Sequence, residues 1–164
     1  MSDKLFRLPV QVLVYCYRRR GKDVEYLMLR RSPKYSAFWQ GVTGAPEGAE
    51  TLLAAAAREL FEETQIVSAT LHQVDFHYTF PVQDQWKWAY HPDTVRIDEY
   101  VFLAEVAFGT HPILSSEHDE FCWASFERAM TRLTWPNNRD ALEFCGRLVN
   151  PSDSALEDSA GKTC

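Results

Sequence analysis

The sequence lacks the features of a membrane-spanning or secreted chain. No stretch approaches the roughly 20 apolar residues of a transmembrane helix, and the longest small apolar run covers only residues 52–57. The first four residues, Met-Ser-Asp-Lys, contain no apolar core of a signal peptide. These absences predict a cytoplasmic protein with no membrane partner.

Cysteine is also scarce, and its spacing suggests no pairing. The four cysteines, at positions 16, 122, 145 and 164, form neither a Cys-x-x-Cys pair nor a zinc-like spacing with histidine. With 164 residues, of which 46% are hydrophobic, the chain can bury a core without disulfides or structural zinc. Length and composition predict one domain over residues 1–150, followed by a flexible Ser-, Asp- and Gly-rich tail over 151–164.

Positive charge is the third shortage. Seventeen lysines and arginines stand against 23 aspartates and glutamates, which gives a net charge of −6. An acidic domain without a basic stripe is a poor nucleic-acid binder, so we expect no nucleic-acid partner. Phosphorylated small molecules remain compatible with this charge, because carboxylates can hold divalent cations against phosphate groups.

Strand-like and helical segments do not alternate regularly along the chain. This order favours an α+β fold, with an α/β/α sandwich as the expected architecture. The irregular segment 81–96 is rich in aromatic residues and is typical of a functional loop. Asn137 or Asn138 is expected to cap the last helix. The patterns predict strands at 8–17, 24–30, 38–43, 66–71, 73–80, 98–106 and 120–124, and helices at 51–64, 126–133 and 139–149.

The helix at 51–64 carries a cluster of carboxylates. Glu59, Glu62 and Glu63 lie at positions i, i+3 and i+4, which places them on one helix face. Clustered carboxylate oxygens suit Mg²⁺, but an acidic run alone is more typical of a solvated face. Three- and four-residue steps predict that the buried face consists of Leu53, Ala56, Ala57, Leu60 and Thr64.

A longer pattern around these glutamates resembles the Nudix box, the signature of the Nudix hydrolases. The last glycine of the box, which precedes its final aliphatic residue, is Gln65 in this chain. A left-handed conformation at a non-glycine residue costs about 1 kcal/mol, so the helix end is expected to differ in shape. The matching residues are Gly44, Glu50, Arg58, Glu59, Leu60, Glu62, Glu63 and Ile66.

The resemblance implies a Nudix-type α/β/α sandwich with a mixed central sheet. It also implies hydrolysis of a nucleoside diphosphate linked to another group, with Mg²⁺ or Mn²⁺ as the cofactor. Glu59 and Glu63 would be the principal metal ligands and Glu62 a further ligand. The carbonyl of Gly44 would coordinate as well. Arg58, together with Glu50, would buttress the loop and the helix.

A second resemblance is to the bacterial dihydroneopterin triphosphate pyrophosphohydrolases, also known as dATP pyrophosphohydrolases. It is carried by segments 7–10, 27–31, 38–44, 117–118 and 138–139, together with Trp135. It implies release of pyrophosphate and a monophosphate from dihydroneopterin triphosphate, in folate biosynthesis, or from a (deoxy)nucleoside triphosphate such as dATP. Glu117 would join the metal site and act as a base.

Two alternatives stay open at this point. Diadenosine tetraphosphate hydrolases also carry a run like Ser116-Glu117-His118 followed by a tryptophan. A Nudix-like ligand sensor is less compatible with the sequence, because such modules usually lose the box glutamates. The sequence does not distinguish a monomer from a homodimer.

The remaining candidates would bind a small phosphorylated substrate. Arg31 suits bidentate contact with a phosphate, and Gln40 suits the edge of a base or pterin ring. Aromatic rings can stack on a flat ligand, although they are more often part of a core. The candidates for stacking are Trp39, Trp88, Tyr90 and Trp135.

Overall fold

The central layer of the computed structural model, which describes residues 5–151, is a mixed sheet. Five strands form the order β3-β2-β1-β6-β5, while β4 also pairs with β1 and β7 with β2. The β1–β6 pair is parallel and the other pairs are antiparallel. The strands are β1 (Val10–Arg20), β2 (Asp23–Arg31), β3 (Trp39–Gln40), β4 (Val42–Gly44), β5 (His72–Pro81), β6 (Arg96–Val106) and β7 (His118–Ser125).

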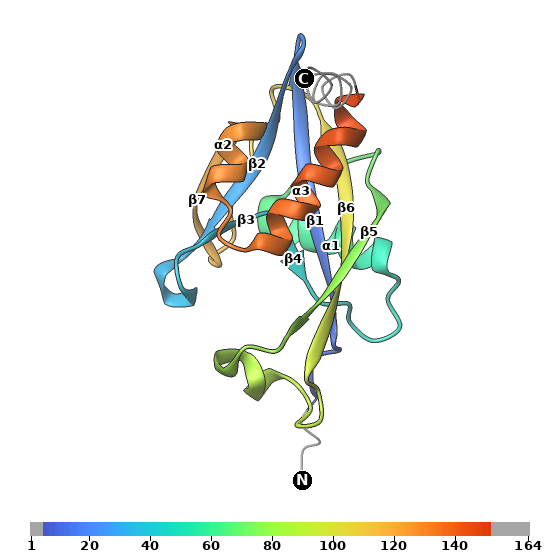
Figure 1. The fold of residues 1–164 in the computed structure, drawn as a ribbon. Helices are drawn as coiled ribbons and strands as arrows, with labels where there is room; N and C mark the ends of the chain where they lie inside the picture. The colour runs from blue at the N-terminus through green and yellow to red at the C-terminus, as the bar shows by residue number, and fades with distance from the viewer. Residues whose placement is uncertain (1–4, 152–164) are drawn as a thin grey trace, which may run out of the picture.

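Helices cover both faces of this sheet. On one face α1 (Leu52–Thr64) packs its alanines against Val12, Val14 and Phe102. On the other face lie α2 (Phe126–Arg132) and α3 (Pro136–Val149). In Figure 1, α3 runs in front of the sheet and α1 lies behind it. The predicted α/β/α sandwich is therefore confirmed, and the apolar run at the centre of β1 reflects burial on both faces.

The predicted buried face of α1 is partly wrong. Ala56, Leu60 and Thr64 are buried as expected, but Leu53 and Ala57 are exposed. In their place the helix buries Ala55 and Glu63. The apolar periodicity missed this rotation because it counted no glutamate as a buried residue.

Both ends of α1 are capped. Thr51 is the N-cap, and its hydroxyl accepts a hydrogen bond from the backbone N–H of Ala54 at 3.1 Å. Gln65 adopts the left-handed conformation, with φ 58°, and its backbone N–H donates to the Phe61 carbonyl. Glutamine therefore forms the left-handed cap expected of glycine, so the expected difference in the shape of the helix end is wrong.

Two predicted boundaries are wrong. Residues 66–71 form no strand, because the hydroxyls of Ser68 and Thr70 bond the Glu105 backbone in an irregular turn. The last helix begins at Pro136 with Trp135 as its N-cap, so Asn137 and Asn138 lie inside the first turn. Proline favours the first helical position because it has no N–H to satisfy.

Two short 3₁₀ helices lie in the connections, η1 (Pro33–Tyr35) and η2 (Asp84–Ala89). The second lies within the aromatic segment that the sequence marks as a loop. No helix in the described part of the chain combines the length and the apolar character needed to cross a membrane. Most of the predicted tail, residues 152–164, lies outside the described residues.

Candidate active site

Gly44, at the end of β4, allows the sheet to approach α1 closely. A Cβ at this position would overlap the carboxyl group of Glu59. Gly44 also pairs with Val12 of β1, so the backbone cannot shift easily to make room. With Glu59 in this place, position 44 therefore requires glycine for steric reasons.

Arg58 ties the loop before α1 to the helix. Its guanidinium binds both carboxylate oxygens of Glu50, at 2.9 and 3.0 Å, and donates to the Ala45 carbonyl at 3.0 Å. The same group contacts Glu59 at 2.9 Å and Glu62 at 3.1 Å. The hydrogen bonds from Arg58 to Glu50 are the largest cause that lowers the pKa of Glu50, and the backbone N–H of Glu47 adds to this effect.

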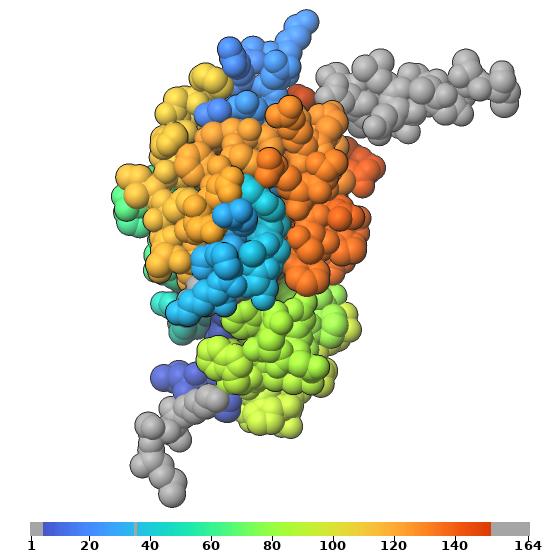
Figure 2. Space-filling view, turned by 90° about the vertical axis from the view of Figure 1, so that its left-hand side faces the viewer, coloured from blue at the N-terminus to red at the C-terminus, as the bar shows by residue number. Residues whose placement is uncertain are grey.

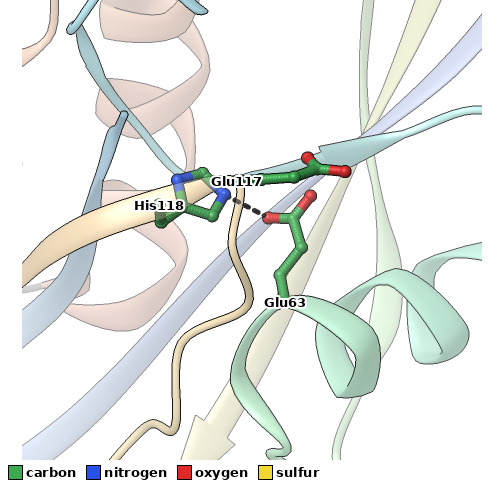
Figure 3. A group of neighbouring side chains, drawn as sticks. All are labelled: Glu63, Glu117 and His118. Carbon is green, nitrogen blue, oxygen red and sulfur yellow. Dashed lines mark hydrogen bonds and ion pairs between the residues drawn. The ribbon is translucent and has the colours of Figure 1, made fainter. Parts of the chain in front are cut away.

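Glu63 lies at the centre of a buried cluster near the end of α1. Its side chain is 3% exposed, and its Oε2 lies 2.9 Å from Nε2 of His118, which is fully buried. Figure 3 shows Glu63 pointing from α1 toward both Glu117 and His118. One ligating atom from each of these three residues lies within 4.8 Å of the others.

Backbone hydrogen bonds hold Glu117 in this place. The N–H of Ser115 donates to the Glu63 carbonyl at 3.2 Å, which fastens the segment before β7 to the end of α1. The N–H of Ser32 donates to the Glu117 carbonyl at 2.9 Å. The two bonds bring a residue 54 positions along the chain to the end of α1, which no local pattern could have shown.

The electrostatics of the cluster favour a cation. Burial raises the pKa of Glu63 well above its usual value, and the negative charge of Glu117 raises it further. Burial also raises the pKa of Glu59 to about 7, while the hydrogen bond from Arg58 opposes this effect. Burial, with the charge of Arg31 next in size, lowers the pKa of His118.

A divalent cation fits the residues present. The Oε1 atom of Glu63 is buried and has no hydrogen-bond partner, which is costly for a carboxylate oxygen unless something binds it. Oxygen ligands of this kind are those that Mg²⁺ and Mn²⁺ prefer. Glu59, Glu63 and Glu117 are the side chains that would hold such an ion.

The predicted ligands are not equally placed. Glu59 and Glu117 line one pocket of about 570 Å³, and Gly44 lines it as well. Glu62 instead has a side chain that is 55% exposed and is bound to Arg58. The structure therefore places Glu117 beside Glu63 and in one pocket with Glu59, and it leaves Glu62 at the solvent side of α1.

The same pocket extends from these carboxylates to the aromatic loop. In Figure 2 the green surface of β5 and the following loop lies directly below the cyan surface around residues 33–40. Both segments contribute to the pocket wall. The aromatic side chains that line it are Phe38, Tyr78, Phe80, Trp86, Trp88, Tyr90 and Trp135.

Most of the predicted substrate contacts line this pocket. Arg31 lies between the two ends, with Nη1 3.7 Å from Glu117 Oε2, and Gln40 donates to the Thr43 hydroxyl at 3.3 Å. Trp88, Tyr90 and Trp135 line it as well. Trp39 does not: its ring packs at the edge of the core, 4.6 Å from the Arg132 guanidinium.

Sequence reasoning missed two features of the site. His118 follows the predicted Glu117, but its bond to Glu63 depends on long-range packing. Glu99 lines the pocket although it is 2% exposed. A signal for Glu99 did exist, because it shares a strand face with Val101 and Leu103 and so breaks an apolar alternation.

Known proteins resemble this chain over most of its length. A family model described as the NUDIX domain matches residues 7–145. A dihydroneopterin triphosphate diphosphatase of Haemophilus influenzae is 35% identical over 136 residues, covering 80% of this chain and 84% of that protein. A protein of the same name from Escherichia coli K12 is 34% identical over 149 residues, covering 87% and 95%.

Solved structures agree with this result. The E. coli dihydroneopterin triphosphate pyrophosphohydrolase superposes with a TM-score of 0.74 and 30% identity, covering 85% of this chain and 96% of that one. A C. elegans Ap4A hydrolase gives 0.68 at 23% identity, covering 86% and 98%, and supports the fold alone. From the box residues, their geometry and these matches, the chain belongs to the Nudix hydrolase family and is a pyrophosphohydrolase.

Proposed function

We propose that this enzyme hydrolyses dihydroneopterin triphosphate or a (deoxy)nucleoside triphosphate to a monophosphate and pyrophosphate, with Mg²⁺ as its cofactor. The observation that carries the proposal is the buried, unpartnered Oε1 of Glu63 beside Glu117, at one end of an aromatic pocket. A triphosphate attached to a flat ring matches both ends of that pocket. The names of the relatives that are 34–35% identical support the same substrate class.

The carboxylate end would bind the phosphates. A divalent cation held by Glu59, Glu63 and Glu117 would supply charge neutralisation and a water of lowered pKa. Arg31 would bind a phosphate oxygen, because its guanidinium already lies at the border between Glu117 and the aromatic wall. Arg58 would position Glu59 by holding it against the loop that precedes α1.

Glu117 would act as the general base. Its side chain is 48% exposed, whereas that of Glu63 is 3% exposed, so Glu117 is the one that an attacking water could reach. A base needs to lie within hydrogen-bond distance of the water that it deprotonates. The position of Glu117 at the pocket wall supports this role.

The test is a product analysis. The protein is incubated with Mg²⁺ and, separately, dihydroneopterin triphosphate, the nucleoside triphosphates and diadenosine tetraphosphate, and the products are separated by chromatography. Glu63→Gln serves as the inactive variant, and Glu143→Gln, on the outer side of α3, as the matched control. Monophosphate and pyrophosphate that depend on Glu63 would support the proposal.

Other outcomes would point to a different function. ATP released from diadenosine tetraphosphate, with triphosphates untouched, would assign the pocket to dinucleotides. Binding of a ligand without any turnover would make the chain a sensor. Turnover that Glu63→Gln retains would place the chemistry elsewhere in the molecule.

A further inference from the structure

Glu99 is an acidic residue at the inner wall of the pocket, whereas the sides of the pocket are mainly aromatic. It stands in the middle of β6, directly between Gln11 of β1 and Tyr78 of β5 in the strand register. All three residues line the pocket that also contains Glu59 and Glu117. Glu99 thus lies in the same cavity as the carboxylates proposed to bind the phosphates, but it is not one of them.

Two neighbours of Glu99 donate hydrogen bonds to its carboxylate. Asn138 Nδ2 donates to the Tyr78 hydroxyl at 2.9 Å, and that hydroxyl donates to Glu99 Oε1. Gln11 Nε2 donates to Glu99 Oε2 at 2.5 Å. A tyrosine hydroxyl carries one proton, so Tyr78, which accepts from Asn138, donates that proton to Glu99. Glu99 is therefore the last acceptor in this chain of hydrogen bonds.

This arrangement leaves acceptor capacity unused. A carboxylate has about four acceptor positions, and the two hydrogen bonds from Gln11 and Tyr78 occupy two of them. Burial raises the pKa of Glu99 to about 7, and the opposing hydrogen bonds come from these two neutral side chains. A buried carboxylate of this kind gains from a ligand that offers further N–H donors.

The aromatic walls limit which donors can reach Glu99. Trp88 is 66% exposed and Trp135 is 37% exposed, and both line the pocket together with Phe80. Exposed tryptophans at a pocket rim are suited to stacking on a flat heterocycle. A ring held between such walls would meet Glu99 with its edge, and its donors would lie in the ring plane.

We propose that Glu99 is a specificity-determining residue that binds the adjacent ring N–H and exocyclic amino group of a 2-amino-4-oxo heterocycle, as in pterin and guanine. The two donors of this edge are parallel and match the two oxygens of a carboxylate. Adenine and cytosine each place a ring acceptor beside the amino group, which would face Glu99 unfavourably. The pocket therefore selects pterin and guanine triphosphates over those of adenine and cytosine. This inference rests on the proposed function.

The test compares GTP with ITP, which differ only in the 2-amino group. We expect kcat/KM for GTP to exceed that for ITP by about tenfold to a hundredfold, the value of one charge-assisted hydrogen bond. In Glu99→Gln the ratio is expected to fall to within about threefold of one. Glu105→Gln is the matched control, because Glu105 lies on the same strand and accepts from Tyr17 outside the pocket.

A binding measurement separates this inference from the proposed hydrolysis. The dissociation constants of GMP and IMP are measured by quenching of tryptophan fluorescence, which requires no turnover and no variant. Tighter binding of GMP supports the inference even if no triphosphate is hydrolysed. Active enzyme with equal kcat/KM for GTP and ITP, or an unchanged ratio in folded Glu99→Gln, would overturn the inference and leave the hydrolytic function intact.

Discussion

The backbone of Gly44 and the side chain of Glu59 are in such close contact that no Cβ fits between them. The sheet edge and the helix therefore fix the position of this carboxylate together. Gly44 shows no left-handed φ, so the requirement for glycine is one of space rather than of backbone conformation. A methyl group at position 44 would therefore act directly on the side chain of Glu59.

Gly44→Ala is expected to lower kcat/KM by about a hundredfold, because a displacement of about 1 Å at a reactive site has an effect of this size. The measurement is Mg²⁺-dependent pyrophosphate release. Gly109→Ala is the matched control, since a Cβ there meets nothing within 4 Å. Equal activity in Gly44→Ala and Gly109→Ala would show that the position of Glu59 is unimportant.

His118 is expected to position Glu63 for metal binding. His118→Leu leaves Glu63 Oε2 without its partner and should weaken Mg²⁺ affinity by about 10- to 100-fold, as loss of a ligand's supporting hydrogen bond usually does. His118→Gln, which can still donate, should restore part of the affinity. Titration calorimetry measures both. A folded His118→Leu variant that binds Mg²⁺ as well as the parent would refute this role.

Metal-dependent stability is expected to grow with pH. The pKa of Glu59 is raised to about 7 and that of Glu63 is also raised, above the unfolded value of 4.5. Protonated carboxyls therefore stabilise the metal-free fold fully below about pH 4.5, and this contribution is lost as the pH rises through about 7. Mg²⁺ must displace these protons, so its affinity rises over the same interval.

The corresponding measurement is the melting temperature at pH 5.5 and pH 8, each with and without Mg²⁺. We expect Mg²⁺ to raise the Tm more at pH 8 than at pH 5.5. Glu63→Gln should reduce the increment at pH 8. An increment that is equal at both pH values would contradict the raised pKa values of the cluster.

Arg58→Lys is expected to destabilise the fold by about 1–2 kcal/mol, because lysine cannot form the two parallel bonds to Glu50. Urea denaturation measures this change. The control is Arg147→Lys on α3, where the arginine makes one exposed bond to Glu143. Similar losses in the two variants would mean that the bonds of Arg58 to the loop contribute little.

The sequence predicted those features that depend on local chemistry. Thr51 and the glutamates of α1 lie within one short segment, so spacing alone located the helix and its carboxylates. The strand predicted at 66–71 failed because Ser68 and Thr70 bond the Glu105 backbone through their hydroxyls, a long-range effect. The start of α3 was missed because Pro136, rather than an asparagine cap, sets it.

Within the site, too, the sequence could not predict contacts that depend on long-range packing. Glu63 was identified from the box, but its pairing with His118 depends on how β7 meets α1. Trp39 and Trp88 look alike in the sequence, yet one packs at the edge of the core and the other lines the pocket. Composition cannot separate them, because the difference arises from which face of the fold each ring occupies.

The most direct test of the central claim, that buried Glu63 holds the catalytic cation, is an anomalous difference map from a crystal soaked in Mn²⁺. We predict a peak about 2.0–2.2 Å from a Glu63 carboxylate oxygen, with Glu59 and Glu117 as its neighbours. The peak should disappear in Glu63→Gln. A Mn²⁺ peak that lies outside this cluster and persists in Glu63→Gln would contradict the account.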